Sequence, residues 1–197
     1  MRRTALVPFL AAALVAVAAP AVRAASLPSG TITCQIAANT DPGLILSPYI
    51  DSTPGGRIIM KGKVTGTCDS SGVTGGRGPI ERFEATLVAK LAAGTVCTDV
   101  ITTPDFDKIK LSLKWKGHVG ERDLTLGTSR VHLLLGSYDD PDEALVFTGE
   151  IFKGAFAGST TSMKLTLHNP VTFLTPNCPR ISGVFYGDDG ESELTIP

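Results

Sequence analysis

Hydrophobic and polar residues alternate in short runs along most of the chain. The clearest run is KIKLSLKWKG, residues 108–117, in which every second residue is hydrophobic and most of the others are lysine. A period of two is typical of a β-strand with one face against a core and the other in water. Further runs of this kind occur at 57–68, 81–91, 144–158 and 162–168. No window has the 3.6-residue hydrophobic period of a helix.

Turn-forming residues separate these runs, because the 21 Gly and 13 Pro are spread along the chain and not clustered. About eight to ten short strands with regular turn signals predict an all-β, antiparallel domain. We expect a β-sandwich, either immunoglobulin-like or jelly-roll-like, and keep a closed β-barrel as the alternative. Gly149, Gly154 and Gly158 predict a bulge or a sharp bend within residues 144–158.

The first residues have the pattern of an export signal. Arg2 and Arg3 precede the uncharged apolar run 7–20, and a small-residue cleavage pattern ends at Ala24. We therefore expect a signal peptide over 1–24, a single domain over 25–197 and a secreted or periplasmic location. The apolar run is too short for a membrane span, so we expect no transmembrane segment in the mature chain.

Four cysteines in an exported chain predict disulfides. Four cysteines allow three pairings, and we favour Cys34–Cys68 and Cys97–Cys178. Cys34 and Cys68 both lie in short threonine-rich runs, TITCQ and TGTCD, which we expect to form neighbouring strands. In the chain-entropy account, each bridge stabilises the fold by about 4 kcal/mol.

Lysines occupy the polar positions of two predicted strands, and this pattern has two interpretations. Removing the signal peptide removes three arginines and lowers the net charge from −1 to −4, so we do not expect a nucleic-acid binder. The lysines either keep one sheet face solvated and protect an edge strand, or they bind a polyanion such as an acidic polysaccharide or lipid head groups. The candidate polyanion-binding residues are Lys61, Lys63, Lys108, Lys110, Lys114 and Lys116.

Two acidic turns, SYDDPDEA and YGDDGESE, are candidates for Ca²⁺, which prefers oxygen ligands, although Asp and Gly are also ordinary turn formers. We expect no cofactor and keep Ca²⁺ as the alternative. The alternation places His118, His132 and His168 on outward faces, where we expect isolated surface histidines. The candidate calcium ligands are Asp139, Asp140, Asp142, Asp188 and Asp189.

Motifs of common enzymes, such as GxSxG, HExxH and a phosphate-binding glycine loop, do not occur, so we expect no catalytic activity. The stretch TGEIFKGAFAG, 148–158, together with the export signal and the two predicted disulfides, resembles exported bacterial all-β proteins of unknown function. This resemblance implies an exported all-β domain and no specific site.

The sequence therefore predicts a non-catalytic binding or interaction domain that contacts a glycan, lipid or protein of the cell envelope. One alternative is a lipocalin-like barrel that carries a small apolar ligand in a cavity lined by Phe83, Trp115, Phe147 and Phe152. The other is a secreted hydrolase, which needs a cleft where two carboxylates, or a histidine and a carboxylate, approach each other.

Overall fold

The computed structural model describes residues 26–102, 106–139, 144–168, 177–187 and 191–197. The predicted signal peptide lies outside these residues. The described elements are β1 (Ser29–Gly30), β2 (Ile32–Ile36), β3 (Asn39–Ile50), β4 (Ile58–Asp69), β5 (Val73–Thr74), β6 (Arg82–Leu91), α1 (Asp99–Thr102), β7 (Phe106–Val119), β8 (Arg122–Asp139), β9 (Ala144–Gly154), β10 (Thr160–Thr166), β11 (Ile181–Tyr186) and β12 (Glu193–Ile196).

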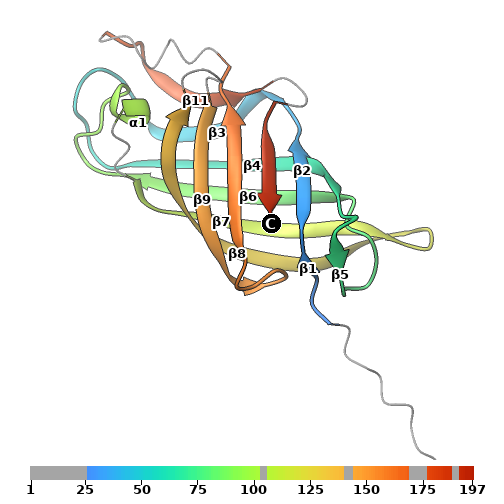
Figure 1. The fold of residues 1–197 in the computed structure, drawn as a ribbon. Helices are drawn as coiled ribbons and strands as arrows, with labels where there is room; N and C mark the ends of the chain where they lie inside the picture. Colours follow the sequence, from blue (N-terminus) through green and yellow to red (C-terminus); the bar gives the residue numbers. More distant parts are fainter. Residues whose placement is uncertain (1–25, 103–105, 140–143, 169–176, 188–190) are drawn as a thin grey trace, which may run out of the picture.

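Eight strands form a closed antiparallel barrel in the order β2-β4-β6-β7-β8-β9-β10-β12, and β12 pairs with β2 to complete the ring (Figure 1). Strands β3 and β11 extend the sheet, since β3 also pairs with β4 and β11 pairs with β3. Strands β1 and β5 form a separate two-stranded sheet. The all-β, antiparallel class is thus confirmed in its alternative form, the closed barrel. The sandwich expected first is wrong, because the last strand pairs with the first and leaves a single ring.

The alternation in the sequence sets which side chains face the barrel interior. Every second residue from Phe83 to Leu91 on β6 and from Ile109 to Trp115 on β7 is hydrophobic, points inward and is buried, while the lysines of both strands point to solvent wherever their side chains are described. Trp115 is 0% exposed, and its ring contacts Phe83 at 6.2 Å and Phe156 at 5.2 Å between centroids. A water-sized hollow beside these rings would leave them measurably exposed, so side chains fill this part of the interior.

One of the four aromatic residues predicted to line a cavity points the other way. Phe83, Trp115 and Phe147 are buried in the interior, but Phe152 is 49% exposed on the outside of the barrel. Phe152 directly follows the inward-facing Ile151 on β9, and neighbouring residues of a strand point to opposite faces. The interior ring from this part of the chain is Phe156, four residues later.

The predicted sharp bend is the turn between β9 and β10, which closes one end of the barrel. Gly154 and Gly158 have positive φ angles of 98° and 88°, and Phe156 adopts φ 59°, so the chain reverses and directs the Phe156 ring inward. The backbone N–H of Phe156 donates to the carbonyl of Pro28 at 2.9 Å, which ties the segment before β1 to the same end. Gly149 remains within β9, paired with Leu133.

The structure contains both disulfides in the favoured pairing. Cys34 and Cys68 are direct partners on the neighbouring strands β2 and β4, as the threonine-rich runs predicted. Cys97 and Cys178 join the β6–β7 and β10–β11 connections at the end of the barrel opposite the β9–β10 turn. One bridge therefore links the neighbouring strands β2 and β4, and the other links two connections at one end of the barrel.

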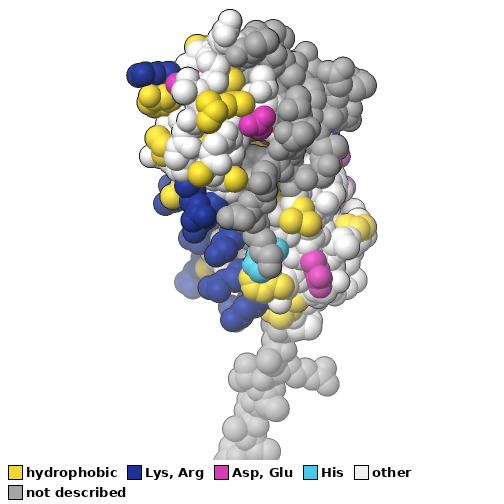
Figure 2. Space-filling model, turned by 90° about the vertical axis from the view of Figure 1, so that its left-hand side faces the viewer, with side chains coloured by type: hydrophobic (Ala, Val, Ile, Leu, Met, Phe, Trp, Pro, Cys, Tyr) yellow, Lys and Arg dark blue, Asp and Glu magenta, His cyan; other side chains and the backbone are white. Residues whose placement is uncertain are grey.

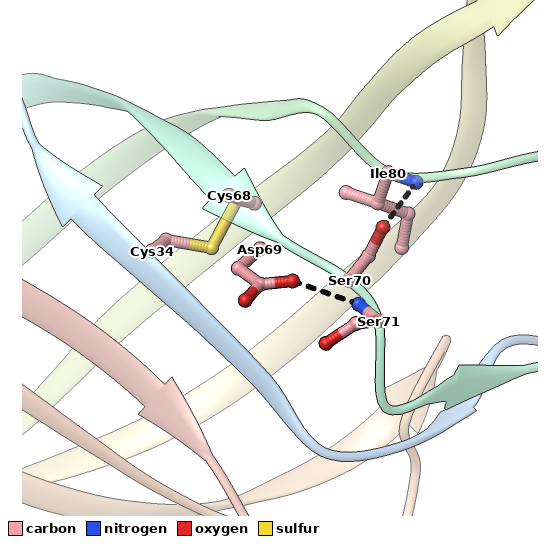
Figure 3. Close-up of a disulfide and its surroundings, with 6 residues drawn as sticks. All are labelled: Cys34, Cys68, Asp69, Ser70, Ser71 and Ile80. Atoms are coloured by element: carbon pink, nitrogen blue, oxygen red, sulfur yellow. Dashed lines mark hydrogen bonds between the residues drawn. A yellow bond between two sulfur atoms is a disulfide. The ribbon is translucent and has the colours of Figure 1, made fainter.

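A short turn follows the Cys34–Cys68 disulfide (Figure 3). The carboxylate of Asp69 accepts a hydrogen bond from the backbone N–H of Ser71 at 2.9 Å, and the hydroxyl of Ser70 accepts one from the N–H of Ile80 at 3.1 Å. Hydrogen bonds from Ser71, the backbone one first, hold the pKa of Asp69 below its ordinary value of 3.8. These contacts fix the start of the β4–β6 connection.

Candidate polyanion-binding surface

Sheet order decides whether the lysines of the sequence share one surface. Strands β4 and β7 are not neighbours, because β6 lies between them, yet the outward positions of all three strands are continuous. Figure 2 shows Lys and Arg side chains gathered on one flank of the barrel. We call this surface the basic face. It consists of seven exposed residues on five consecutive strands, namely Lys61, Lys63, Lys90, Lys110, Lys114, Arg130 and Lys153.

None of these seven cations forms an ion pair with a described carboxylate. The ion pairs of this flank lie toward the β7–β8 hairpin, where Arg82 binds Asp123 and Lys116 lies 3.6 Å from Glu84. Glu84 is the register partner of Lys114 but makes its ion pair with Lys116. No described carboxylate therefore compensates the middle of the basic face; the side chain of Asp107, the register partner of Lys90, lies outside the described residues.

Like charges also face each other directly on this surface. Arg130 on β8 and Lys153 on β9 are register partners, and both are exposed. Directly opposed like charges across an antiparallel pair destabilise a sheet, whereas opposite charges stabilise it by about 0.2–1 kcal/mol. A face that served only to keep the sheet soluble would gain from carboxylates at such positions.

The structure groups four of the six predicted lysines, Lys61, Lys63, Lys110 and Lys114. Lys116 is excluded by its contact with Glu84, and the side chain of Lys108 lies outside the described residues. Sequence reasoning missed three members because each lies alone on its strand, without a run of lysines to mark it. They are Lys90, Arg130 and Lys153.

A groove of about 800 Å³ adjoins the basic face on the outside of β8, β9, β10 and β12. His132, on its wall, is the register partner of Lys110 on one side and of Glu150 on the other. The imidazole of His132 stacks on the exposed ring of Phe152 at 4.3 Å between centroids. The remaining wall is rich in hydroxyl groups and includes Leu134, Thr148, Thr160, Ser162 and Thr195.

The predicted calcium site and a histidine metal site are not found in the described part of the chain. The described residues contain no group of three or more His, Cys, Asp or Glu side chains placed to hold a metal ion. Four of the five candidate calcium ligands lie outside the described residues, namely Asp140, Asp142, Asp188 and Asp189. The fifth, Asp139, ends β8, and its side chain is not described. His118 and His168 are exposed and His132 is half-buried, on separate strands or connections.

One histidine does meet a carboxylate. Nδ1 of His118 lies 2.6 Å from the carboxylate of Glu81, and both side chains are 44% exposed. The pair lies near the β7–β8 hairpin and outside the groove described above. It is an exposed pair on the surface of the barrel.

Comparison of the chain with protein-family models, curated proteins and solved structures found no match. Across the described ranges, no helix is long and apolar enough to cross a membrane. The basic face and the adjoining groove are therefore the features from which a function is argued.

Proposed function

We propose that the protein is an exported, non-catalytic binding domain that binds polyanions outside the cytoplasm through the basic face. The observation that carries this proposal is the set of seven exposed cations on five consecutive strands, none of them paired with a described carboxylate. Clustered charge of one sign attracts a ligand of the opposite sign and raises its association rate. The two disulfides suit an oxidising compartment, which agrees with the expected export.

The net charge of the whole chain shows that the basic face needs its own explanation. The expected mature chain carries a net charge of −4, so the basic face is not a by-product of a basic composition. The opposed pair Arg130 and Lys153 costs stability in the free protein, and an anion lying between the two side chains would remove that cost. Binding of a polyanion thus accounts for an arrangement that folding alone disfavours.

The packed interior favours a site on the outside of the barrel over a carrier cavity. The Trp115 ring contacts the rings of Phe83 and Phe156, and all three are at most 2% exposed. A small apolar ligand would have to displace these side chains, at a cost comparable to overpacking a core. The outer surface, in contrast, offers its cations without rearrangement.

The proposal is tested with dextran sulfate as the polyanion and calorimetry as the measurement. The triple variant Lys63→Glu, Lys110→Glu, Arg130→Glu reverses charges on three strands of the basic face, and we expect at least a tenfold loss of affinity. The matched control, Arg57→Glu, Arg77→Glu, Arg122→Glu, makes the same net charge change at exposed positions outside the basic face. We expect the control to lose less than threefold.

Two outcomes would overturn the proposal: equal losses in the two triple variants, or no binding of dextran sulfate by the native protein at low salt. Raising the salt concentration should weaken native binding, because exposed charges are screened within about 10 Å at 0.1 M salt. Fluorescence of Trp115, the sole tryptophan, reports whether each variant is folded.

A further inference from the structure

We propose that the bound polyanion is a flexible acidic polysaccharide, which crosses the strands of the basic face and places an uncharged sugar unit in the adjoining groove. This inference rests on the proposed function and adds the class of ligand and a second contact. It follows from the curvature of the basic face, from the position of the groove and from the chemistry of the groove wall.

The basic face curves around the barrel. Eight strands share one full turn, so the outward directions of neighbouring strands differ by about 45°. Lys61 on β4 and Lys153 on β9 are four strand steps apart, so the basic face bends around the barrel between them. A flat bilayer would reach the cations of only two or three neighbouring strands, whereas a flexible chain can follow all five.

Two exposed hydrophobic residues near the basic face lie on different sides of it. Ile59 on β4 and Leu134 on β8 are 42% and 59% exposed, and three strand steps separate them. Their outward directions therefore differ by about 135°. The two side chains do not enter one flat lipid surface together.

The groove lies beside the basic face, along β8 and β9 and onward to β10 and β12. Lys110, His132 and Glu150 are consecutive register partners on β7, β8 and β9, so a chain that crosses these strands passes from a cation to the groove wall. Glu150 disfavours an acidic group at this point, because its exposed carboxylate repels a group of like charge. The ligand unit that occupies the groove is therefore uncharged.

The groove wall has the chemistry that an uncharged sugar needs. Thr148, Thr160, Ser162 and Thr195 supply hydroxyl groups that donate and accept hydrogen bonds. Leu134 and the exposed ring of Phe152 at its margin supply apolar contacts for the C–H groups of a sugar ring. Acidic groups of the same chain then lie along the lysines of β4, β6 and β7.

The first test compares dextran sulfate fragments of graded length, neutral dextran, and vesicles of phosphatidylglycerol and phosphatidylcholine. The path from β4 to β9 measures about 19 Å at the backbone, from four strand spacings of about 4.8 Å. We expect the affinity for dextran sulfate to rise with fragment length until the fragment exceeds this span. Affinity independent of length, or vesicles that bind more tightly than long fragments, would overturn the inference in favour of a point contact or a membrane.

The second test fills the groove without changing charge. Thr148→Tyr adds a ring to the wall of the groove, and Thr125→Tyr is the control at an exposed position of β8 outside it. The probe is long hyaluronan, in which acidic sugars alternate with uncharged N-acetylglucosamine. We expect Thr148→Tyr to weaken its binding at least fivefold and Thr125→Tyr less than twofold. If the basic-face triple variant loses binding while Thr148→Tyr does not, the proposed function stands and the groove contact is wrong.

Discussion

Replacing Ser129 with alanine tests the polar contacts that hold Trp115 in the barrel interior. The indole N–H of Trp115 donates to the hydroxyl of Ser129 at 2.8 Å, and that hydroxyl donates to the carbonyl of Ala155 at 2.6 Å. Trp115 is 0% and Ser129 1% exposed, so water does not reach either group. Ser129→Ala therefore leaves one buried donor and one buried acceptor without a partner.

The cost follows from those two orphaned groups. Each unsatisfied buried polar group costs about 1–3 kcal/mol. Part of this cost is offset, because the alanine variant no longer has to remove a serine hydroxyl from water on folding. We expect the free energy of unfolding to fall by about 2–4 kcal/mol. At this chain length, that corresponds to a fall in Tm of roughly 4–16 °C.

The assay is urea unfolding followed by tryptophan fluorescence, which reports on this site alone because the chain has a single Trp. The matched control is Ser112→Ala, on the exposed face of β7, where the expected change lies within about 0.5 kcal/mol. If Ser129→Ala and Ser112→Ala lose the same small amount, the hydrogen-bonded chain contributes nothing and the reasoning fails. A changed urea dependence would instead signal an altered denatured state.

Three further predictions concern the Cys34–Cys68 disulfide, the buried ring of Phe156 and the pKa of Asp69. Cys34→Ala with Cys68→Ala should cost about 4 kcal/mol in urea unfolding, from the closed loop between the two residues, and a loss below about 1 kcal/mol would contradict the chain-entropy account. Phe156→Ala should cost about 3–5 kcal/mol because the ring is buried against the core, whereas Phe152→Ala should cost less than about 1 kcal/mol; equal losses would contradict this assignment of faces. The depressed pKa of Asp69 means that the fold favours its carboxylate, so this contribution is present above pH 3.8 and is lost as the pH falls through the lower folded pKa. An NMR titration should give a midpoint below 3.8, and a midpoint at or above that value would show that the Ser71 contact is absent in solution.

Local pattern predicted the strands, the disulfide pairing and the bend after β9, but it did not distinguish a barrel from a sandwich. Alternation in residues 108–117 shows which side chains are buried, and both architectures bury one face of each strand. Closure depends on the pairing of β12 with β2, residues far apart in the chain, for which the sequence has no local signal. The expected all-β class therefore followed from the residues, whereas the architecture required the structure.

The binding surface was predictable only in part, for the same reason. Lysines that repeat along one strand are visible in the sequence, as at Lys61 and Lys63. Lys90 and Arg130 join them only because β6 pairs with β4 and β8 pairs with β7. The groove was missed entirely, because its wall combines hydroxyl, apolar and charged residues from four strands with no motif in any one of them.

A substitution at the opposed cations Arg130 and Lys153 distinguishes a ligand-binding face from a face that is only hydrated. Lys153→Glu turns the opposed pair into one of opposite charge, which should raise the free energy of unfolding by about 0.2–1 kcal/mol. The same change should weaken dextran sulfate binding, because it removes one cation and adds a repelling carboxylate. A face that is only hydrated would show the gain in stability and no change in binding. A binding face would gain stability and lose affinity for dextran sulfate. This opposition is expected where a function is retained at a cost in stability. Parallel measurements of urea unfolding and of affinity on this one variant, with Arg57→Glu as the control for net charge, therefore decide what the uncompensated lysines are for.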